Sequence, residues 1–254
     1  MLAEERRDKL LHMINENSSI STSEISKVLG VSPVTVRTDL NFLEKIGKIQ
    51  RVHGGAVAIQ TRLNQEIPSS QKSKLNRQAK QIIGRTAAEM VKDGDVIILD
   101  SGTTTFQIGL ALKGRKITVI TNDIEIGRLM AEEEDCTLIM TGGVAMKTVP
   151  TLTGIDAVNF FSSIQADKLF LGCDAIDWSF GVSNRTLDEV SVKKAMIRAS
   201  DEIIAVADRS KLDQRVFARV CHFDELDLFL TDRLTDREKE ECERIGLCYR
   251  TVIE

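Results

Sequence analysis

The chain has 254 residues, of which 42% are hydrophobic, 28% charged and 4% aromatic, a composition typical of folded globular proteins. This composition excludes a collagen-like or disordered chain, and the length suits about two domains. The formal net charge is −4, so no overall positive field attracts nucleic acid or an anionic membrane surface. Any basic surface therefore has to be local.

The cysteines and histidines do not form a metal-binding or disulfide pattern. The five cysteines are odd in number and contain no CxxC pair, and only three histidines accompany them. We therefore expect reduced thiols, no structural zinc and no cofactor. The first residues contain no apolar signal segment, and no run approaches the ~20 apolar residues of a membrane span. These features predict a cytoplasmic protein with no membrane partner.

The distribution of charge marks a domain boundary. Between Lys45 and Lys80 there are eight basic residues and one acid, Glu66. Short helical segments precede this basic stretch, and β-branched runs that alternate with helical segments follow it from about Asp95. We predict a first domain at residues 1–58, a linker at 59–75 and a second domain at 76–254.

The first domain is predicted to contain three helices. Residues 3 to 16 have helical periodicity, and the second helix begins at the capping box Ser21 to Glu24 and stops at Gly30. A third helix follows almost at once, with Ser32 as N-cap and Pro33 at its first position, where the missing N–H costs nothing. Two helices joined by a tight glycine turn predict a helix-turn-helix.

The third helix has an apolar face and a polar face. Val36, Leu40 and Leu43 fall on one side at helical spacing, so the opposite side faces outward. Arg37 lies on the flank, where its guanidinium can reach a phosphate or a guanine edge. The basic run from residues 48 to 57 surrounds a Gly-Gly turn and predicts a β-hairpin wing. The predicted DNA-contacting residues are Ser32, Val34, Thr35, Arg37, Thr38, Asn41, Lys45, Arg51 and His53.

An alternative interpretation is that these helices form a small packing bundle whose charges only face solvent. What favours DNA binding is a set of residues at Arg6, Leu10, Ile14, Ser32 to Leu40 and Arg51 to Ala56. This set resembles the signature of the DeoR family of bacterial transcriptional regulators. The resemblance implies a winged helix-turn-helix domain that binds double-stranded operator DNA.

Strand-like and helical segments alternate in the second domain. This alternation implies βαβ units and a mostly parallel sheet in an α/β domain. Ligands of such sheets bind beyond the carboxyl ends of the strands. The predicted strands are residues 96–99, 117–121, 137–141, 168–171, 202–207, 226–230 and 247–252, with helices at about 71–92, 104–113 and 123–133.

The loops that follow these strands are rich in small polar residues. The loop from Asp100 to Thr105 stands directly before a helix, where glycine permits close backbone approach and successive N–H groups can form an anion nest. A turn with an N-cap explains this loop equally well, and no Walker sequence is present. Because loops after parallel strands converge on one edge, we expect a joint ligand site. The predicted binding residues are Asp100, Ser101, Gly102, Thr103, Thr104, Asn122, Gly142, Gly143, Asp174, Glu189 and Lys211.

The order of these loops, with Gly172 to Asp177 and Ala207 to Lys211, resembles the sensor domain of the same family. The resemblance implies a fold similar to ribose-5-phosphate isomerase and CoA transferases, and the sensing of phosphorylated sugars or related metabolites. It also implies the role of each residue: a phosphate cradle at Ser101 to Thr104, a neutralising charge at Lys211, hydroxyl contacts at Asp174 and Asn122, and a former general base at Glu189.

Together the two domains predict a DNA-binding transcriptional regulator, a repressor of a carbohydrate catabolic operon whose operator binding is modulated by a phosphorylated sugar or sugar alcohol. Because two-fold operators need paired recognition helices, we expect a homo-oligomer, a dimer or a tetramer. The alternative is a sugar-phosphate isomerase-like enzyme with an appended DNA-binding module, in which Glu189 or Asp174 acts as base. Since a sensor needs the same pocket as such an enzyme, we assign no residue a catalytic role.

Overall fold

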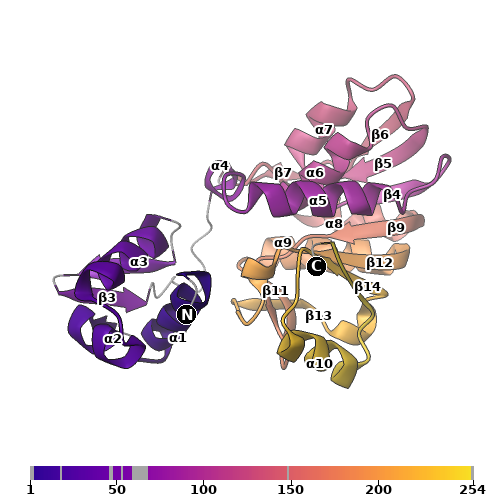
Figure 1. Ribbon diagram of the computed structural model, residues 1–254. Helices are drawn as coiled ribbons and strands as arrows, with labels where there is room; N and C mark the ends of the chain where they lie inside the picture. The colour runs from indigo at the N-terminus through magenta and orange to yellow at the C-terminus, as the bar shows by residue number, and fades with distance from the viewer. Residues whose placement is uncertain are drawn as a thin grey trace. The chain divides into compact units, whose positions relative to one another are not determined.

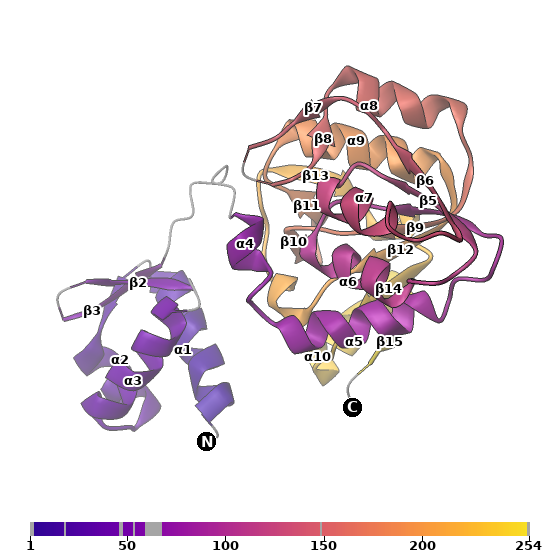
Figure 2. The ribbon, with the colours of Figure 1, turned by 90° about the horizontal axis from the view of Figure 1, so that it is seen from above.

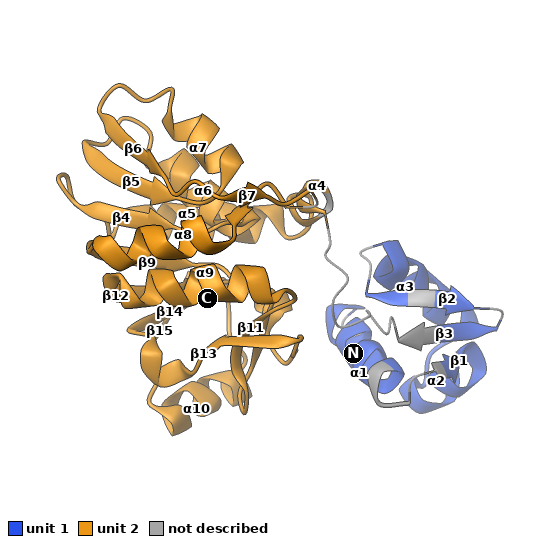
Figure 3. Cartoon of the chain, turned by 180° about the vertical axis from the view of Figure 1, so that it is seen from behind, with its two compact units in different colours: residues 1–63 blue, residues 64–254 orange. Residues whose placement is uncertain are grey.

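The computed structural model describes residues 3–17, 19–45, 48–52, 54–58, 68–147 and 149–252. The chain divides into a first unit, Met1–Leu63, and a second unit, Asn64–Glu254 (Figure 3). Much of the predicted linker, residues 59–67, lies outside the described residues. The rest of that segment, from Pro68, belongs to the second unit and contains a short helix.

The first unit contains the three predicted helices, and its local signals match the sequence. Ser21 caps the second helix through a complete capping box with Glu24, and Gly30 ends it at a φ of 64°. The hydroxyl of Ser32 accepts a hydrogen bond from the amide of Thr35 at 3.2 Å, as expected of an N-cap. The elements are α1 (Ala3–Asn17), β1 (Ser19–Ser21), α2 (Thr22–Leu29), α3 (Pro33–Lys45), β2 (Ile49–Val52) and β3 (Gly55–Ala58).

A strand that the sequence did not reveal completes the wing. β1 pairs antiparallel with β3, so the predicted hairpin is part of a three-stranded sheet in the order β1-β3-β2. Gly55 permits this close pairing, because a Cβ there would lie 2.3 Å from the carbonyl oxygen of Ile20. The sheet covers one hydrophobic core whose fully buried members include Leu10, Ile14 and Leu40.

The second unit is built on seven parallel strands in the order β15-β14-β12-β9-β4-β5-β6 (Figure 1). All seven coincide with predicted strands, which confirms the mostly parallel α/β fold. Their bounds are β4 (Val96–Leu99), β5 (Ile117–Thr121), β6 (Cys136–Met140), β9 (Ala166–Leu171), β12 (Ser200–Val206), β14 (Leu228–Thr231) and β15 (Tyr249–Thr251).

Helices cover both faces of this sheet. The helices α5, α6 and α7 lie on one face, and α8 and α9 lie on the other (Figure 2). Ile97 and Leu99 belong to the hydrophobic core on the first face, whereas Ile98 belongs to the core on the second. None of the helices within the described ranges is long and apolar enough to cross a bilayer. The helices are α4 (Ser69–Lys72), α5 (Arg77–Ala88), α6 (Thr103–Ala111), α7 (Ile124–Met130), α8 (Ile155–Phe160), α9 (Leu187–Arg198) and α10 (Asp236–Ile245).

The second unit also contains smaller elements that were not predicted from the sequence. A second, antiparallel sheet has the order β10-β11-β13, and a two-stranded pair joins β7 to β8. Their bounds are β7 (Val144–Ala145), β8 (Leu152–Thr153), β10 (Ala175–Asp177), β11 (Gly181–Asn184) and β13 (Ala218–Cys221), and the short 3-10 turns are η1 (Phe161–Ser163), η2 (Arg209–Lys211) and η3 (Phe223–Glu225).

The helical segment predicted at about residues 71–92 contains α5 but is interrupted before it. The chain leaves α4 at Lys72, turns, and starts α5 after Asn76, which has a φ of 51°. The buried Lys80 stabilises this break, because its ammonium donates to the carbonyl oxygens of Lys72 at 2.6 Å and Leu75 at 2.8 Å. Those carbonyls therefore have a side-chain partner where a continuous helix would have paired them with amides.

The crossing of α5 and α6 predicts a stability effect at Gly84. A Cβ at this position would stand 2.7 Å from the backbone carbon of Gln107 in α6. We expect Gly84→Ala to lower the free energy of unfolding by about 1–3 kcal/mol, measured by urea denaturation. Arg85→Ala, an exposed change on the same helix, is the control and should stay within about 0.5 kcal/mol of wild type. Equal stability of the two variants would contradict this packing.

Candidate functional sites

The polar face of α3 is exposed as the sequence predicted. Val36, Leu40 and Leu43 are buried, while Val34 is 68% exposed. Of the other predicted contacts on this helix and at its cap, Thr35 is half-buried and five residues are exposed, namely Ser32, Arg37, Thr38, Asn41 and Lys45. The helix thus presents a continuous surface of the kind that enters a major groove.

Two further predicted contacts lie on the wing. The guanidinium of Arg51 donates to the side-chain oxygen of Asn41, and its backbone amide donates to Glu44 Oε1 at 3.0 Å. These bonds tie β2 to the exposed face of α3. His53 lies outside the described residues.

A buried carboxylate fixes α3 against α1. Asp39 accepts hydrogen bonds from Arg6 Nε at 2.6 Å and from Arg7 Nε at 2.9 Å. The Arg7 guanidinium also lies 3.9 Å from the centroid of the Phe42 ring, a cation–π contact. Because Asp39 is fully enclosed, its charge is tolerated only with these partners, so the orientation of α3 depends on them.

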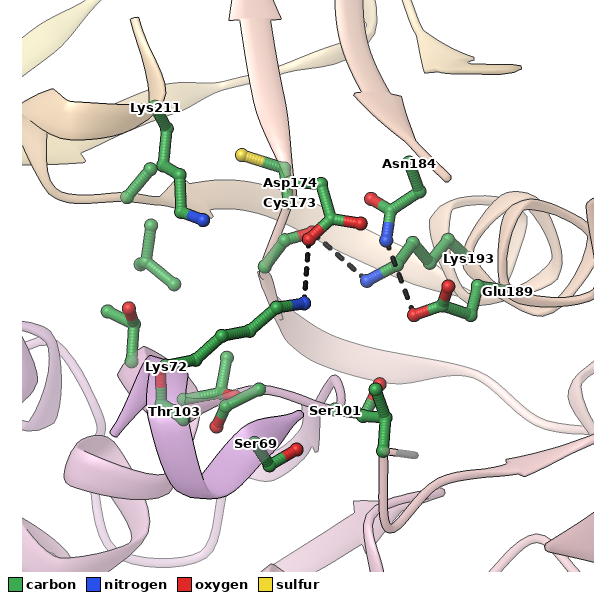
Figure 4. A pocket seen from close by; sticks show the side chains of 17 residues that line it. Ser69, Lys72, Ser101, Thr103, Cys173, Asp174, Asn184, Glu189, Lys193 and Lys211 are labelled. Atoms are coloured by element: carbon green, nitrogen blue, oxygen red, sulfur yellow. Dashed lines mark hydrogen bonds and ion pairs between the residues drawn. The ribbon is translucent and has the colours of Figure 1, made fainter. Parts of the chain in front are cut away.

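In the second unit, a pocket opens at the carboxyl ends of the central strands (Figure 4). Its wall combines the loop that leads into α6, the end of β9, the start of α9 and the turn η2. Among the predicted binding residues, it is lined by Ser101, Gly102, Thr103, Thr104, Asp174, Glu189 and Lys211. The structure therefore brings several strand-end loops together at one edge of the sheet.

The loop before α6 offers fewer open amides than the anion nest predicted from its sequence. The amide of Gly102 is already taken, because it donates to Asp123 Oδ2 at 3.2 Å. Among the described residues, no hydrogen bond engages the amides of Thr103 and Thr104. These two N–H groups, at the positive end of α6, form the available part of the nest.

Charged side chains of both signs line the pocket. Lys72 Nζ forms an ion pair with Asp174 Oδ1 at 2.8 Å, and the Arg185 amide donates to Oδ2 at 3.3 Å. Burial raises the pKa of the Asp174 carboxyl, but the charges of Lys72, Lys211 and Arg185 outweigh it and lower the pKa to about 2. Asp174 is therefore an anion at neutral pH and an acceptor for hydroxyl groups.

At the wall of the pocket, Lys193 joins the ends of the two central strands. Its ammonium donates to Asp100 Oδ2 and to the carbonyl oxygen of Gly172, the latter at 3.0 Å. Burial lowers the pKa of Lys193, but the carboxylates around it, Asp100 foremost, raise it above its ordinary value. Four residues earlier on α9, Glu189 accepts from the Thr186 hydroxyl at 2.7 Å.

Four of the predicted binding residues do not line the pocket. Asp100 lies beneath it, fully buried against Lys193. Asn122 is buried, and its amide group donates to Thr151 Oγ1 at 2.9 Å and to a backbone carbonyl. The remaining two, Gly142 and Gly143, follow the edge strand β6, and a Cβ on Gly143 would lie 2.5 Å from the carbonyl oxygen of Thr153. Local packing therefore requires glycine at Gly143, whereas Gly142 has a φ of 69°, a backbone conformation that favours glycine.

The pocket also has polar lining residues that the sequence did not reveal: Ser69, Lys72, Asn184 and Lys193. Lys193 follows Glu189 by four residues, a helical spacing that places both on one face, so this pattern could have indicated it. Lys72 approaches Asp174 from 102 positions away in the chain, and no local pattern reports such a contact.

Comparison with protein families decides what this architecture is. A model of the DeoR-like helix-turn-helix domain matches residues 6–62, and a model of the DeoR C terminal sensor domain matches residues 75–233. The chain belongs to the DeoR family of transcriptional regulators. The resemblance noted in the sequence and the prediction of a DNA-binding transcriptional regulator are confirmed.

Relatives within the family span nearly the whole chain. The HTH-type transcriptional regulator GlpR of Haloferax volcanii is 34% identical, over 97% of this chain and 97% of its own length. The putative aga operon transcriptional repressor of Escherichia coli O157:H7 is also 34% identical, over 90% of this chain and 86% of its length. Both are named as regulators of transcription and neither as an enzyme.

Solved structures share the fold at low sequence identity. eIF2B delta from Chaetomium thermophilum is similar over 89% of this chain and 70% of that chain, with a TM-score of 0.50 and 15% identity. Ribose 5-phosphate isomerase A from Methanocaldococcus jannaschii matches 54% of this chain and 55% of that chain, with a TM-score of 0.39 and 19% identity. The first likeness concerns the fold alone, and the second is too distant to carry an argument about chemistry.

The carboxyl of Asp123 accepts the hydrogen bond of the Gly102 amide, and we expect its titration to make the stability of the protein depend on pH. Burial raises its pKa to about 6, although the amides of Ile126, Glu125 and Gly102 oppose the shift. The folded protein therefore keeps this proton at pH values where the unfolded chain has released it. The stabilising contribution is complete below about pH 4 and is lost as the pH rises through about 6.

Asp123→Asn tests this dependence, because the amide cannot titrate. Between about pH 4 and pH 7, the free energy of unfolding of wild type should fall by up to about 3 kcal/mol relative to the variant. Urea unfolding of both proteins at several pH values measures the difference. Parallel pH profiles would show that Asp123 titrates in its ordinary range.

Proposed function

We propose that this regulator represses a carbohydrate catabolic operon, and that its operator affinity changes when a phosphorylated sugar or sugar alcohol binds the pocket of the second unit. The observation that carries the proposal is the lining of this one pocket. It combines lysine side chains and open backbone amides, which suit a phosphoryl group, with carboxylates, which suit hydroxyl groups. The relative named as an aga operon repressor supports the role as a repressor.

The chemistry of one side of the pocket suits a phosphoryl group. Lys211 reaches the pocket from η2, and the amides of Thr103 and Thr104 add two donors at the start of α6. A phosphoryl group takes hydrogen bonds from backbone amides at a helix N-terminus and is neutralised by a nearby lysine. We therefore propose that the phosphoryl group lies between Lys211 and the first turn of α6.

The other side suits hydroxyl groups. Asp174 accepts hydrogen bonds through both carboxylate oxygens, and Asn184 Nδ2 lies 3.4 Å from Glu189 Oε1. Carboxylates and amides at fixed positions are the groups that orient a polyol. Lys193 neutralises the carboxylate beneath, so the pocket as a whole does not repel an anion. The relatives carry regulators' names, which favours a sensing pocket over a catalytic one.

The exposed face of α3 supplies the partner surface for operator DNA. We propose that the predicted contacts on this face read the major groove and that Arg51 and the wing hold the backbone. A homo-oligomer, a dimer or tetramer, would present paired copies of α3 to a two-fold operator. The effector regulates binding only if it favours one of two states, so its affinity for the DNA-competent form has to differ from that for the other form.

Lys211→Ala tests the phosphoryl site. We expect the variant to lose release from operator DNA by the effector while keeping its operator affinity in the effector's absence, because Lys211 belongs to the pocket and not to the predicted DNA-contacting face. A thermal-shift screen of phosphorylated sugars and polyols finds the effector, and fluorescence anisotropy with labelled operator measures release. Lys194→Ala, an exposed lysine of α9, is the control. A normal response in the Lys211 variant would remove this residue from the site.

Arg37→Ala tests the DNA-reading face. We expect operator affinity to fall by at least about tenfold at fixed salt, because a charged contact to phosphate or guanine is lost. Arg37→Lys distinguishes the two contacts: it retains much of a phosphate contact but loses a bidentate guanine contact. Circular dichroism checks that both variants are folded. Unchanged affinity of a folded Ala variant would place Arg37 outside the DNA interface.

A further inference from the structure

The short helix α4 is the first described element after residues 59–67. The chain that comes from the DNA-reading unit therefore enters the described part of the second unit at α4. Among the side chains described between residues 68 and 79, none belongs to either hydrophobic core cluster of the second unit. The body of the unit therefore holds α4 by polar contacts, whose strength depends on the charges around them.

Three side chains make these contacts. Lys72 forms the 2.8 Å ion pair with Asp174, and Asn76 Nδ2 donates to Asp208 Oδ1 at 2.7 Å. Lys80 holds the turn after α4 from below, through the carbonyl oxygens of Lys72 and Leu75. Of these three, only Lys72 reaches into the pocket, where its side chain extends from α4 to Asp174 (Figure 4).

We propose that the Lys72–Asp174 ion pair is a latch: it holds α4 when the pocket carries no ligand, and a phosphorylated ligand opens it. This inference rests on the proposed function, because it names how that pocket is regulated. The opened latch frees the segment to which the chain from the DNA-reading unit attaches. The latch is thus the contact by which the ligand changes operator affinity.

The ligand and the latch compete for the same atoms. A hydroxyl that donates to Asp174 Oδ1 takes the position of Lys72 Nζ, and a phosphoryl group offers the ammonium another anion in the same pocket. After the exchange, Asp174 retains Lys211 and Arg185 as neighbouring positive charges, so its buried carboxylate is not left alone. Because charges are exchanged and not simply removed, the opening does not require an uncompensated buried ion.

The ligand-free protein tests the latch directly. Lys72→Met keeps the length of the side chain and removes its charge, and the double variant Lys72→Met, Asp174→Asn removes both charges should an unpaired Asp174 prevent folding. The control is Lys74→Met, an exposed lysine that follows α4 by two residues. Hydrogen exchange is followed in the full chain at the amides of Lys72 and Ser73, which donate to Pro68 and Ser69.

With the latch removed, these two amides should exchange about tenfold faster than in wild type, and ligand-free operator affinity should fall about fivefold, while Lys74→Met changes neither. Folded latch variants whose exchange and operator affinity lie within about twofold of the Lys74 variant overturn the proposal.

A second arm uses ribose 5-phosphate as the probe. In wild type, we expect the probe to protect the amides of Thr103 and Thr104 from exchange and to speed exchange at the amides of Lys72 and Ser73. In the latch variants, we expect only the protection of Thr103 and Thr104. Protection of the threonine amides in wild type without faster exchange in α4 overturns the latch and leaves the phosphoryl site intact. No protection at the threonines argues against the proposed ligand class, and the ligand-free comparison then decides the latch by itself.

Discussion

The buried ion pair between Lys193 and Asp100 holds together the three segments on which the pocket is built. Asp100 ends β4, the Gly172 amide at the end of β9 donates to Asp100 Oδ2 at 2.9 Å, and Lys193 comes from α9. Such a pair needs further hydrogen bonds inside a protein, and here the Gly172 amide and carbonyl supply them to Asp100 Oδ2 and to Lys193, while Asp100 Oδ1 has no hydrogen-bond partner among the described residues. The loop before α6 leaves the sheet directly from this carboxylate, so its position follows from the pair.

Carboxylates, and not only open amides, determine where an anion can bind. Asp123 occupies the amide of Gly102, whereas the amides of Thr103 and Thr104 at the start of α6 stay open. A phosphoryl group therefore fits at the amides of Thr103 and Thr104, which follow Gly102 in the loop. The same arrangement explains why three lysines line a pocket that holds two acidic side chains, since the buried Asp100 adds a third negative charge below.

The sequence predicts those features that depend on local periodicity or on a capping residue. The alternation at Ile97, Ile98 and Leu99 follows from side chains pointing to opposite faces of a strand, and Ser21 with Glu24 fixes a helix start. What depends on distant partners was not predictable. The break after Lys72 requires Lys80 to reach back to two carbonyls, and β1 becomes a strand only by pairing with β3. The contact of Asn122 with Thr151 was not predictable either, because the two residues are 29 positions apart.

The kind of contact that holds an element decides whether a ligand can release it. Apolar contacts contribute about 25 cal/mol per Å² of buried surface whatever charge is nearby, so a helix such as α5, with Ile83 in the core, stays in place when an anion arrives. An ion pair weakens when a competing charge enters the same pocket, because each partner gains an alternative. Lys72 and Asp174 belong to this second class, on the element where the chain enters the sensor domain. A fold that packs α5 by apolar contacts and α4 by charges therefore separates the part that has to remain rigid from the part that can respond.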